Sequence, residues 1–265
     1  MNVLQRLLLK LKKKVNKDFK GIQWKNPLIL FLCVLLVFLL VGSAINGCLG
    51  LNRKIVIELD AAFGGDTKGY QGIVTSATEN EKIVDALETI LNEDHRFVAK
   101  KTQEDGTYAS IEQRKEQIEK DNPTIVISIR LQGSPYPEES GMYTYAQLSS
   151  MKKHKESKKL ANAINDVFKE DTTTNIGYLY YAPIKDTDTY ELLFKDIEEK
   201  EVKDLETFAL MEQCESTPVV VISPFYVTNQ SEVDTYANEE GYQRIAQKIY
   251  QAICNFNGLE VKNNE

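Results

Sequence analysis

The chain has 265 residues and a formal net charge of −7, so it is long enough to bury a full core in one domain. Residues 1–26 carry eight basic side chains against one acid, a balance of +7, which leaves −14 for the rest of the chain. This negative charge argues against a nucleic-acid partner, because phosphate binding needs a positive face. The four cysteines are too few for a disulfide-dense framework.

Residues 27–52 form an apolar segment, PLILFLCVLLVFLLVGSAINGCLGLN, without a charged side chain. Roughly 20 apolar residues suffice to cross a bilayer as a helix. Since basic segments stay on the cytoplasmic side, the sequence predicts a cytoplasmic segment 1–26, a transmembrane anchor 27–52 and an extracytoplasmic domain 53–265 at the cell membrane. A cleaved signal peptide and a lipoprotein modified at Cys48 are the alternatives, but VGSAINGC fits a cleavage site poorly.

Residues 53–265 contain no repeats or low-complexity linkers and are predicted to form one domain. In the first half, short apolar runs alternate with segments of helical period; Ile83, Leu87 and Ile90, for example, fall on one helix face. The pattern predicts strands over 54–59, 96–102 and 124–130, and helices over 79–94 and 110–121, the second ended by Pro123.

The second half continues the alternation. The pattern predicts an outer strand over 141–148, strands over 175–184 and 218–225, and helices over 156–169, 204–214 and 239–254. Fully apolar strands that alternate with helices are typical of a parallel sheet covered on both faces. The fold class is therefore α/β: a single three-layer domain with a mostly parallel twisted sheet flanked by helices, preceded by one transmembrane helix.

Cys214 and Cys254 are the two cysteines of the predicted exterior domain. They form a disulfide or remain two buried thiols, and their spacing shows no metal-binding pattern. Two buried thiols are the favoured alternative.

Binding sites on sheets of this kind lie at the carboxyl ends of the strands. Those ends are residues 60–65, 130–133 and 223–225. The corresponding sequences are LDAAFGG at 59–65, SIRLQ at 128–132 and PVVVISPFYVTN at 218–229, with GYQGIVTSATENEKI between the first two.

In this order, the segments resemble the zinc-dependent N-acetylmuramoyl-L-alanine amidases that trim peptidoglycan, over nearly all of residues 54–256. Members of that family bind zinc with two His and one Glu, leave a position for water, and use a second Glu as general base. The family's first strand leads into Asp-Pro-Gly-His-Gly-Gly, where this chain has LDAAFGG.

This chain departs from the family at the chemical positions. Phe63 and Arg130 stand where the family has its two His ligands, Ser76 where it has the Glu ligand, and Ser223 where it has the general base. The resemblance implies zinc, but these substitutions predict a degenerate member with no zinc and no catalytic residue. The candidate residues of the binding cleft are Asp60, Phe63, Ser76, Arg130 and Ser223.

Two questions stay open for the cleft. Zinc could be held by relocated carboxylates of Asp60, Glu79 or Glu81, although a permanent charge on Arg130 would repel a cation and first-turn acids are ordinary in helices. The guanidinium of Arg130 beside the ring of Phe63 could hold a carboxylate of a stem peptide. Alternatively, Arg130 pairs with Asp60 and Phe63 fills the former metal cavity, which is the favoured reading.

The sequence thus predicts a membrane-anchored, extracytoplasmic amidase-like pseudoenzyme of cell-wall remodelling. It would act by binding peptidoglycan or its fragments, or a protein partner. The alternatives are an active zinc amidase with relocated ligands and a structural subunit of a membrane complex.

Overall fold

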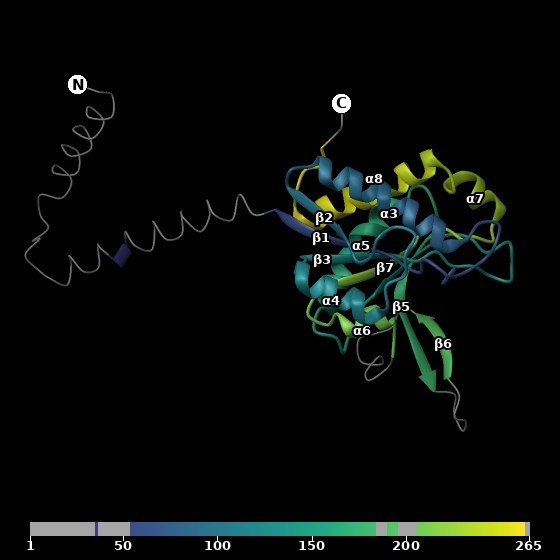
Figure 1. Cartoon of the computed structure of the whole chain (residues 1–265), viewed down its shortest axis with the longest axis horizontal. Helices are drawn as coiled ribbons and strands as arrows, with labels where there is room; N and C mark the ends of the chain where they lie inside the picture. Colours follow the sequence, from purple (N-terminus) through teal and green to yellow (C-terminus); the bar gives the residue numbers. More distant parts are fainter. Residues whose placement is uncertain (1–34, 37–53, 184–189, 196–205, 263–265) are drawn as a thin grey trace, which may run out of the picture. The chain divides into compact units, whose positions relative to one another are not determined.

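The computed structural model describes residues 35–36, 54–183, 190–195 and 206–262 (Figure 1). For residues 180–183 and 190–195 it describes the backbone alone. The described residues from 54 onward belong to one compact unit. The predicted segments 1–26 and 27–52 lie outside the described residues except for Leu35 and Leu36. Among the helices of the described part, none is long and apolar enough to cross a membrane.

A single sheet forms the centre of the unit, with the strand order β2-β1-β3-β7-β4-β5-β6 along the described residues. Its strands are β1 Ile55–Ala61, β2 Phe97–Lys101, β3 Ile125–Ile129, β4 Met142–Ala146, β5 Thr174–Pro183, β6 Tyr190–Lys195 and β7 Val219–Ser223. The β2-β1-β3-β7 and β4-β5 pairs are parallel, whereas β4 runs antiparallel to β7 and β6 antiparallel to β5. The predicted mostly parallel sheet is confirmed.

Helices cover both faces of this sheet, as the three-layer prediction requires (Figure 1). Against one face lie α3 Ser76–Glu93, α5 His154–Phe168 and α8 Glu239–Asn257, which bury the larger apolar cluster. Against the other lie α4 Ile111–Asp121 and the short α6 Ala209–Gln213, which bury a smaller cluster around Val126 and Val221. The short helix α7 Gln230–Tyr236 leads into α8.

The prediction of β4 as an outer strand is wrong, because β4 lies between β7 and β5. The alternation of polar and apolar residues over 141–148 is the basis of that prediction. In the fold, the Thr144 hydroxyl donates to Asn165 Oδ1 on α5 at 2.7 Å, and the Tyr145 hydroxyl donates to Gln132 Oε1 at 2.7 Å. Buried polar groups that find partners inside the protein give the same sequence pattern as an exposed face.

Several elements differ from the sequence prediction. Strand β6 and helix α7 were not predicted, helix α3 begins three residues earlier, at Ser76, and α6 begins only at Ala209. Helix α7 has one buried apolar residue, Val233, so it lacks a periodic signal; its start is fixed by the side chain of Asn229, which accepts from the amide of Glu232.

Both described cysteines are buried free thiols, as favoured from the sequence. Cys214 packs in the cluster under α6, whereas Cys254 packs in the cluster under α8 on the opposite face of the sheet. Burial raises the pKa of Cys214 to about 12, so its thiol stays protonated and unreactive.

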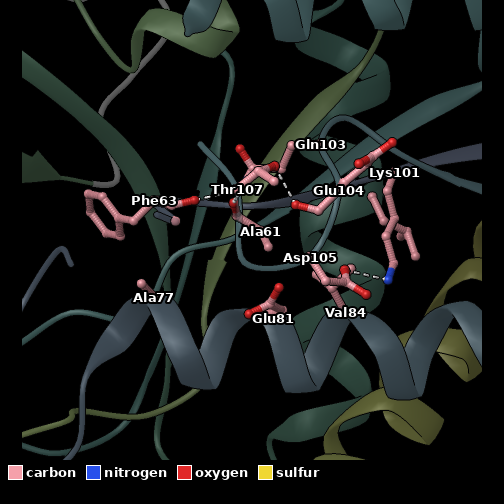
Figure 2. Close-up of a pocket in the computed structure, with 12 residues that line it drawn as sticks. Ala61, Phe63, Ala77, Glu81, Val84, Lys101, Gln103, Glu104, Asp105 and Thr107 are labelled. Carbon is pink, nitrogen blue, oxygen red and sulfur yellow. Dashed lines mark hydrogen bonds and ion pairs between the residues drawn. The ribbon is translucent and has the colours of Figure 1, made fainter. Parts of the chain in front are cut away.

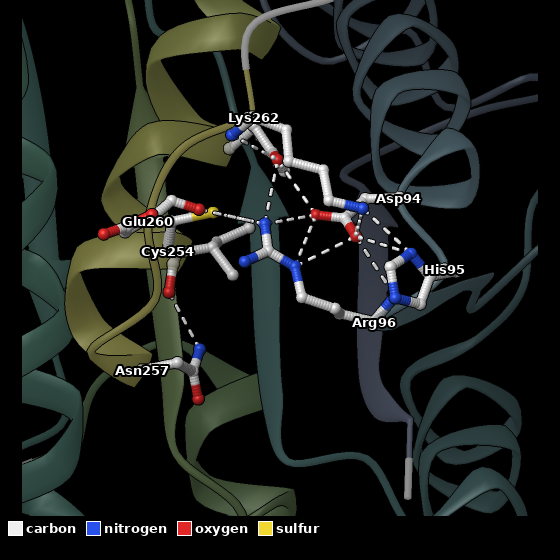
Figure 3. A network of polar contacts seen from close by, with 9 residues as sticks. Asp94, His95, Arg96, Cys254, Asn257, Glu260 and Lys262 are labelled. Atoms are coloured by element: carbon white, nitrogen blue, oxygen red, sulfur yellow. Dashed lines mark hydrogen bonds and ion pairs between the residues drawn. The ribbon is translucent and has the colours of Figure 1, made fainter. Parts of the chain in front are cut away.

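A charged network ties the C-terminal residues to the turn between α3 and β2 (Figure 3). The carboxylate of Asp94 accepts from Arg96 Nε at 2.9 Å and from the Tyr250 hydroxyl at 2.9 Å, and it lies 3.3 Å from Lys262 Nζ. Arg96 also donates to the carbonyl of Glu260 at 3.0 Å. Burial acts to raise the pKa of Asp94, but these hydrogen bonds outweigh it and hold the pKa well below its usual range. The carboxylate is therefore charged at neutral pH, and the network fastens the chain end to the domain.

Glu58 is a buried carboxyl in the middle of β1 whose two oxygens have no hydrogen-bond partner among the described residues. Burial, and then the charge of Asp121, raise its pKa to about 8. Below that pH the folded protein keeps a proton that the unfolded chain releases above about pH 4.3. The free energy of unfolding should therefore fall as pH rises from about 5 to 8.

Replacing Glu58 with glutamine removes the titrating group. We expect Glu58→Gln to be nearly neutral at pH 5 and to raise the free energy of unfolding by roughly 3 kcal/mol at pH 8. Urea unfolding followed by circular dichroism at both pH values measures this, with the exposed Glu119→Gln on α4 as the control. Equal pH slopes in wild type and Glu58→Gln would contradict it.

Candidate functional site at the carboxyl edge of the sheet

The turn after β1 has an unusual backbone. Phe63 has φ 74°, in the left-handed region, and Gly64 and Gly65 follow with φ 135° and 52°. A bulky residue in this region costs of order 1 kcal/mol or more, so the surroundings must hold it there. The side-chain amide of Gln103 does so by donating to the carbonyls of Ala61 at 2.9 Å and Phe63 at 2.5 Å.

Figure 2 shows where the ring of Phe63 goes. The backbone carbonyl of Phe63 faces Gln103 beside a cavity of about 10 Å³, which has room for about one water. The ring of Phe63 points away from that cavity. A Cβ built on Gly69 would come within 2.4 Å of both a Phe63 ring carbon and Ser76 Oγ. The ring, Gly69 and Ser76 therefore meet, and only glycine fits between them.

Ser76 is the first residue of α3 and is fully buried. Its Oγ accepts from the amide of Tyr70 at 2.9 Å and donates to the carbonyl of Lys68 at 3.4 Å. These bonds fold the glycine-rich segment back over the helix start. The hydroxyl is thus used to hold the loop.

Arg130 follows β3 and lies against two aromatic rings. Its guanidinium carbon is 4.4 Å from the ring centre of Phe63 and 5.6 Å from that of Phe208. Its amide donates to the carbonyl of Ile222 at 2.8 Å, which sets the end of β3 beside the end of β7. There Ser223 Oγ accepts from the amide of Gln132 at 3.1 Å. The four positions singled out by the family resemblance thus lie along one edge of the sheet.

Asp60 is paired with Arg114 of α4, so the favoured hypothesis that Asp60 pairs with Arg130 is wrong. Its carboxylate accepts from Thr102 Oγ1 at 2.7 Å, from Arg114 Nη1 at 3.0 Å and from Ser128 Oγ at 2.6 Å. All four side chains are buried. The role of Arg114 was missed because the packing of α4 over this face, which brings Arg114 to Asp60, is not visible in a sequence period.

A cavity of about 560 Å³ opens between this edge and the segment around α6; we refer to it as the edge cavity. Of the five predicted cleft residues, Asp60 and Arg130 line it, whereas Phe63, Ser76 and Ser223 do not. Sequence reasoning missed three further kinds of lining: Gln132 beyond β3, the rings of Tyr70, Tyr145 and Phe208, and the acids Glu206 and Glu212. Gln132 could have been found from the alternation of side chains along an extended segment, because residues 128, 130 and 132 share one face.

The carboxylates considered as relocated ligands are all bound elsewhere. Glu79 accepts from the Tyr242 hydroxyl on α8 and from Lys82 Nζ at 3.2 Å, and Glu81 accepts from the amide of Gly106. Glu79 is buried and is more than an ordinary first-turn acid. Among the described residues, no group of three or more His, Cys, Asp or Glu could hold a metal ion.

A zinc ion does not fit the side chains at the positions where the family places its ligands. A phenyl ring donates no lone pair, a guanidinium repels a cation, and the Ser76 hydroxyl is already engaged. The two histidines are elsewhere: His95 is exposed beside Asp94, and His154 at the start of α5 is buried against the carbonyl of Gln147.

Comparison with known proteins agrees with the fold. A curated protein of Buchnera aphidicola, provisionally named an N-acetylmuramoyl-L-alanine amidase, is 26% identical over 229 residues, which cover 78% of this chain and 96% of that protein.

Solved structures share the fold at lower identity. The catalytic domain of CwlV, an N-acetylmuramoyl-L-alanine amidase from Bacillus (Paenibacillus) polymyxa, has a TM-score of 0.58 at 22% identity, covering 78% of this chain and 99% of that one. An N-acetylmuramoyl-L-alanine amidase from Clostridium difficile 630 has a TM-score of 0.61 at 16% identity, with coverages of 78% and 99%. The CwlD amidase from Clostridioides difficile, solved in complex with the GerS lipoprotein, has a TM-score of 0.57 at 20% identity, covering 78% and 100%.

The model of the Amidase_3 family, described as N-acetylmuramoyl-L-alanine amidase, matches residues 57–255 and so spans β1 to the last turns of α8. The chain therefore belongs to the N-acetylmuramoyl-L-alanine amidase family.

Proposed function

We propose that this chain is a non-hydrolytic member of its family that binds peptidoglycan, or fragments of it, through the carboxyl edge of the sheet. The observation that carries the proposal is the chemistry at that edge. Phe63, Ser76 and Arg130 supply a ring, an engaged hydroxyl and a cation where the family binds zinc, and Ser223 supplies a hydroxyl in place of the general base.

The fate of the nearby carboxylates also supports this proposal. A relocated zinc site would have to take Asp60 from Arg114, Glu79 from Tyr242 or Glu81 from the amide of Gly106. Breaking the first of these pairs leaves a buried guanidinium uncompensated, which costs about 3–5 kcal/mol. Hydrolytic activity with zinc held by these other carboxylates is therefore the less favoured function.

The experiment uses the full chain purified in detergent. We expect fewer than about 0.1 zinc ions per chain, because the described residues hold no group of three ligands, and we expect no release of stem peptide from purified peptidoglycan. We also expect the chain to sediment with insoluble peptidoglycan. Arg130→Ala should reduce the bound fraction roughly tenfold, since a charge-assisted contact contributes about 1.5–3 kcal/mol.

The matched control is Arg244→Ala, which removes an exposed arginine of α8 that pairs with Glu240. It should leave sedimentation unchanged. Stoichiometric zinc together with released stem peptide would overturn the proposal in favour of the active enzyme. Equal sedimentation of Arg130→Ala and wild type would remove the edge from wall binding.

The setting that we propose is the membrane surface facing the wall, with residues 27–52 as anchor and residues 53–265 outside the cytoplasm. The support is the charge pattern, because a basic segment precedes an uncharged apolar one. A protein partner also belongs to the proposal, since the relative CwlD was solved in complex with a lipoprotein. Protease treatment of cells whose wall has been removed tests the topology; digestion of the domain only after these cells are lysed would contradict it.

A further inference from the structure

A group of lysines lies around the start of helix α5. Residues 151–159, MKKHKESKK, hold five lysines and one glutamate, a balance of +4, and we refer to these five lysines as the lysine group. The chain from residue 53 onward carries −14 overall, so its other residues carry −18. Lys152, Lys155 and Lys159 are exposed. The lysine group is therefore a local positive charge on a strongly acidic domain.

The helix itself gains no stability from these charges. The start of a helix carries a partial positive charge, which favours acids and disfavours lysines there. Helices α4 and α8 follow this rule, because each begins with a capping side chain, Ser110 or Asn238, and has acids in its first turn. Helix α5 begins at His154 after Lys153, whose side chain makes no capping hydrogen bond. The lysines lower the stability of this helix start unless an anion outside the helix compensates them.

Contacts within the domain leave most of this charge in place. Lys152 Nζ lies 3.7 Å from Glu215 and Lys153 Nζ lies 3.5 Å from Glu156, and such solvent-exposed pairs contribute little. Lys159 Nζ donates to a backbone carbonyl at 3.2 Å, which carries no net charge. The lysine group can therefore attract an anionic partner.

The lysine group lies at the edge of the sheet where β1, β3 and β7 begin, which we call the amino edge. Strand β4 runs antiparallel to β7, so Ala146 at its end lies beside Val220 near the start of β7. The hydroxyl of Ser157, in the first turn of α5, donates to the carbonyl of Val219 at 2.6 Å. Helical side chains lean toward the N-terminus of their helix, so the first lysines of α5 extend toward the amino edge.

The chain enters the domain at this same edge. The amide of Ile55, the first residue of β1, donates to the carbonyl of Arg96 at 2.8 Å. Arg96 donates in turn to the carbonyl of Glu260, beyond the end of α8 (Figure 3). Lys159 reaches the carbonyl of Phe256 in the last turn of the same helix. A continuous set of contacts thus connects the start of β1 with the lysine group.

We propose that the amino edge docks on an anionic membrane surface, with the lysine group contacting the phosphates of lipid headgroups. This inference rests on the anchored setting of the proposed function and is independent of wall binding. The length of the connecting chain supports it: the proposed anchor ends at residue 52, and the three steps to Ile55 extend about 11 Å at most.

Charge complementarity selects the face that docks. Each lysine near an anionic membrane surface raises the affinity about fivefold, whereas the acidic remainder of the domain is repelled. The carboxyl edge, at the opposite ends of β1, β3 and β7, would then face away from the membrane and toward the wall. Docking would therefore orient the domain as well as hold it.

The test uses the full chain in lipid nanodiscs, made of phosphatidylcholine alone or with about one third phosphatidylglycerol. Acetylation by an amine-reactive ester, followed by mass spectrometry, measures the accessibility of each lysine. We expect Lys152, Lys155 and Lys159 to react about fivefold more slowly in the anionic discs, and roughly 0.5 M salt to remove the difference. Lys169, exposed at the other end of α5, is the internal control and should react equally in both discs.

Charge reversal assigns the effect to the lysine group. Lys152→Glu with Lys155→Glu should abolish the slower reaction of Lys159 in anionic discs, and it should leave sedimentation with peptidoglycan unchanged. The matched control, Lys115→Glu with Lys169→Glu, reverses two lysines away from the amino edge and should keep the slower reaction. Circular dichroism shows whether each variant is folded. Lys152→Gln with Lys155→Gln, which removes the charges without reversing them, serves if the first variant does not fold.

Equal reaction of the lysine group in the two kinds of disc would overturn the inference and leave the anchored setting standing. A chain that does not insert into the discs would reject the setting and the inference together. Soluble polyphosphate that slows these lysines in neutral discs as strongly as the anionic lipid does would reject lipid as the partner. Slower reaction in anionic discs by a chain that does not sediment with peptidoglycan would support membrane docking and reject wall binding.

Discussion

Replacing Asp60 with alanine is expected to lower the free energy of unfolding by about 3–5 kcal/mol. The substitution removes the acceptor of three hydrogen bonds, from Thr102, Arg114 and Ser128. Arg114 then remains buried with its charge uncompensated. Urea unfolding of wild type and variant, followed by circular dichroism, measures the loss.

A double variant separates the pair from the packing around it. Asp60→Leu with Arg114→Met replaces both charges by apolar side chains and should recover most of the stability lost in Asp60→Ala. The exposed pair of Glu240 and Arg244 on α8 provides the control, because Glu240→Ala should cost less than about 0.5 kcal/mol. A loss below about 1 kcal/mol in Asp60→Ala would show that the buried pair contributes little.

Restoring the ligand types of the family should convert the edge into a metal site. We expect the triple variant Phe63→His, Ser76→Glu and Arg130→His to bind about one zinc ion per chain after dialysis. The reason is geometric: the Phe63 ring contacts both Arg130 and the neighbourhood of Ser76, so three ligands placed there would converge. The smaller imidazole also leaves room for the longer side chain of glutamate. Elemental analysis, and the absorption spectrum of the cobalt form, measure the outcome.

The matched control keeps two of the new ligands and replaces the third by an apolar residue: Phe63→Leu, Ser76→Glu and Arg130→His. It should bind zinc at least tenfold more weakly than the triple variant. Adding Ser223→Glu to the triple variant supplies the general base that the family resemblance implies, and stem-peptide release then tests for hydrolysis. A folded triple variant without zinc would show that the turn has lost the geometry as well as the ligands.

Much of the fold could be predicted from the sequence because burial leaves a periodic trace. Strands β3 and β7 are buried at every position, and their sequences, IVISI and VVVIS, are apolar except for one serine each. Helix α8 shows its inward face through Tyr242, Ile245 and Ile249. The prediction that β4 is an outer strand was wrong because Thr144 and Tyr145 are polar yet buried. Their hydrogen-bond partners come from other elements.

The candidate site was predictable in its location but not in its contacts. The family resemblance indicated Phe63, Ser76, Arg130 and Ser223, and the fold brings the first three into one neighbourhood. The partner of Asp60 was not predictable, because Arg114 reaches it from a helix 54 residues away in the chain. Phe208 was missed likewise, since nothing local indicates that residues before α6 fold over Arg130.

The position of β7 in the strand order has a consequence for how the domain assembles. This strand lies between β3 and β4, but it begins only at Val219, 93 residues after its partner Val126. During synthesis about the first four-fifths of the chain would emerge with β3 and β4 each lacking one neighbouring strand. Closure of such long loops slows folding and leaves strand edges open to wrong pairing. The nascent domain should therefore depend on chaperones until its last fifth has left the ribosome, and truncation before Val219 should yield aggregates rather than a smaller folded core.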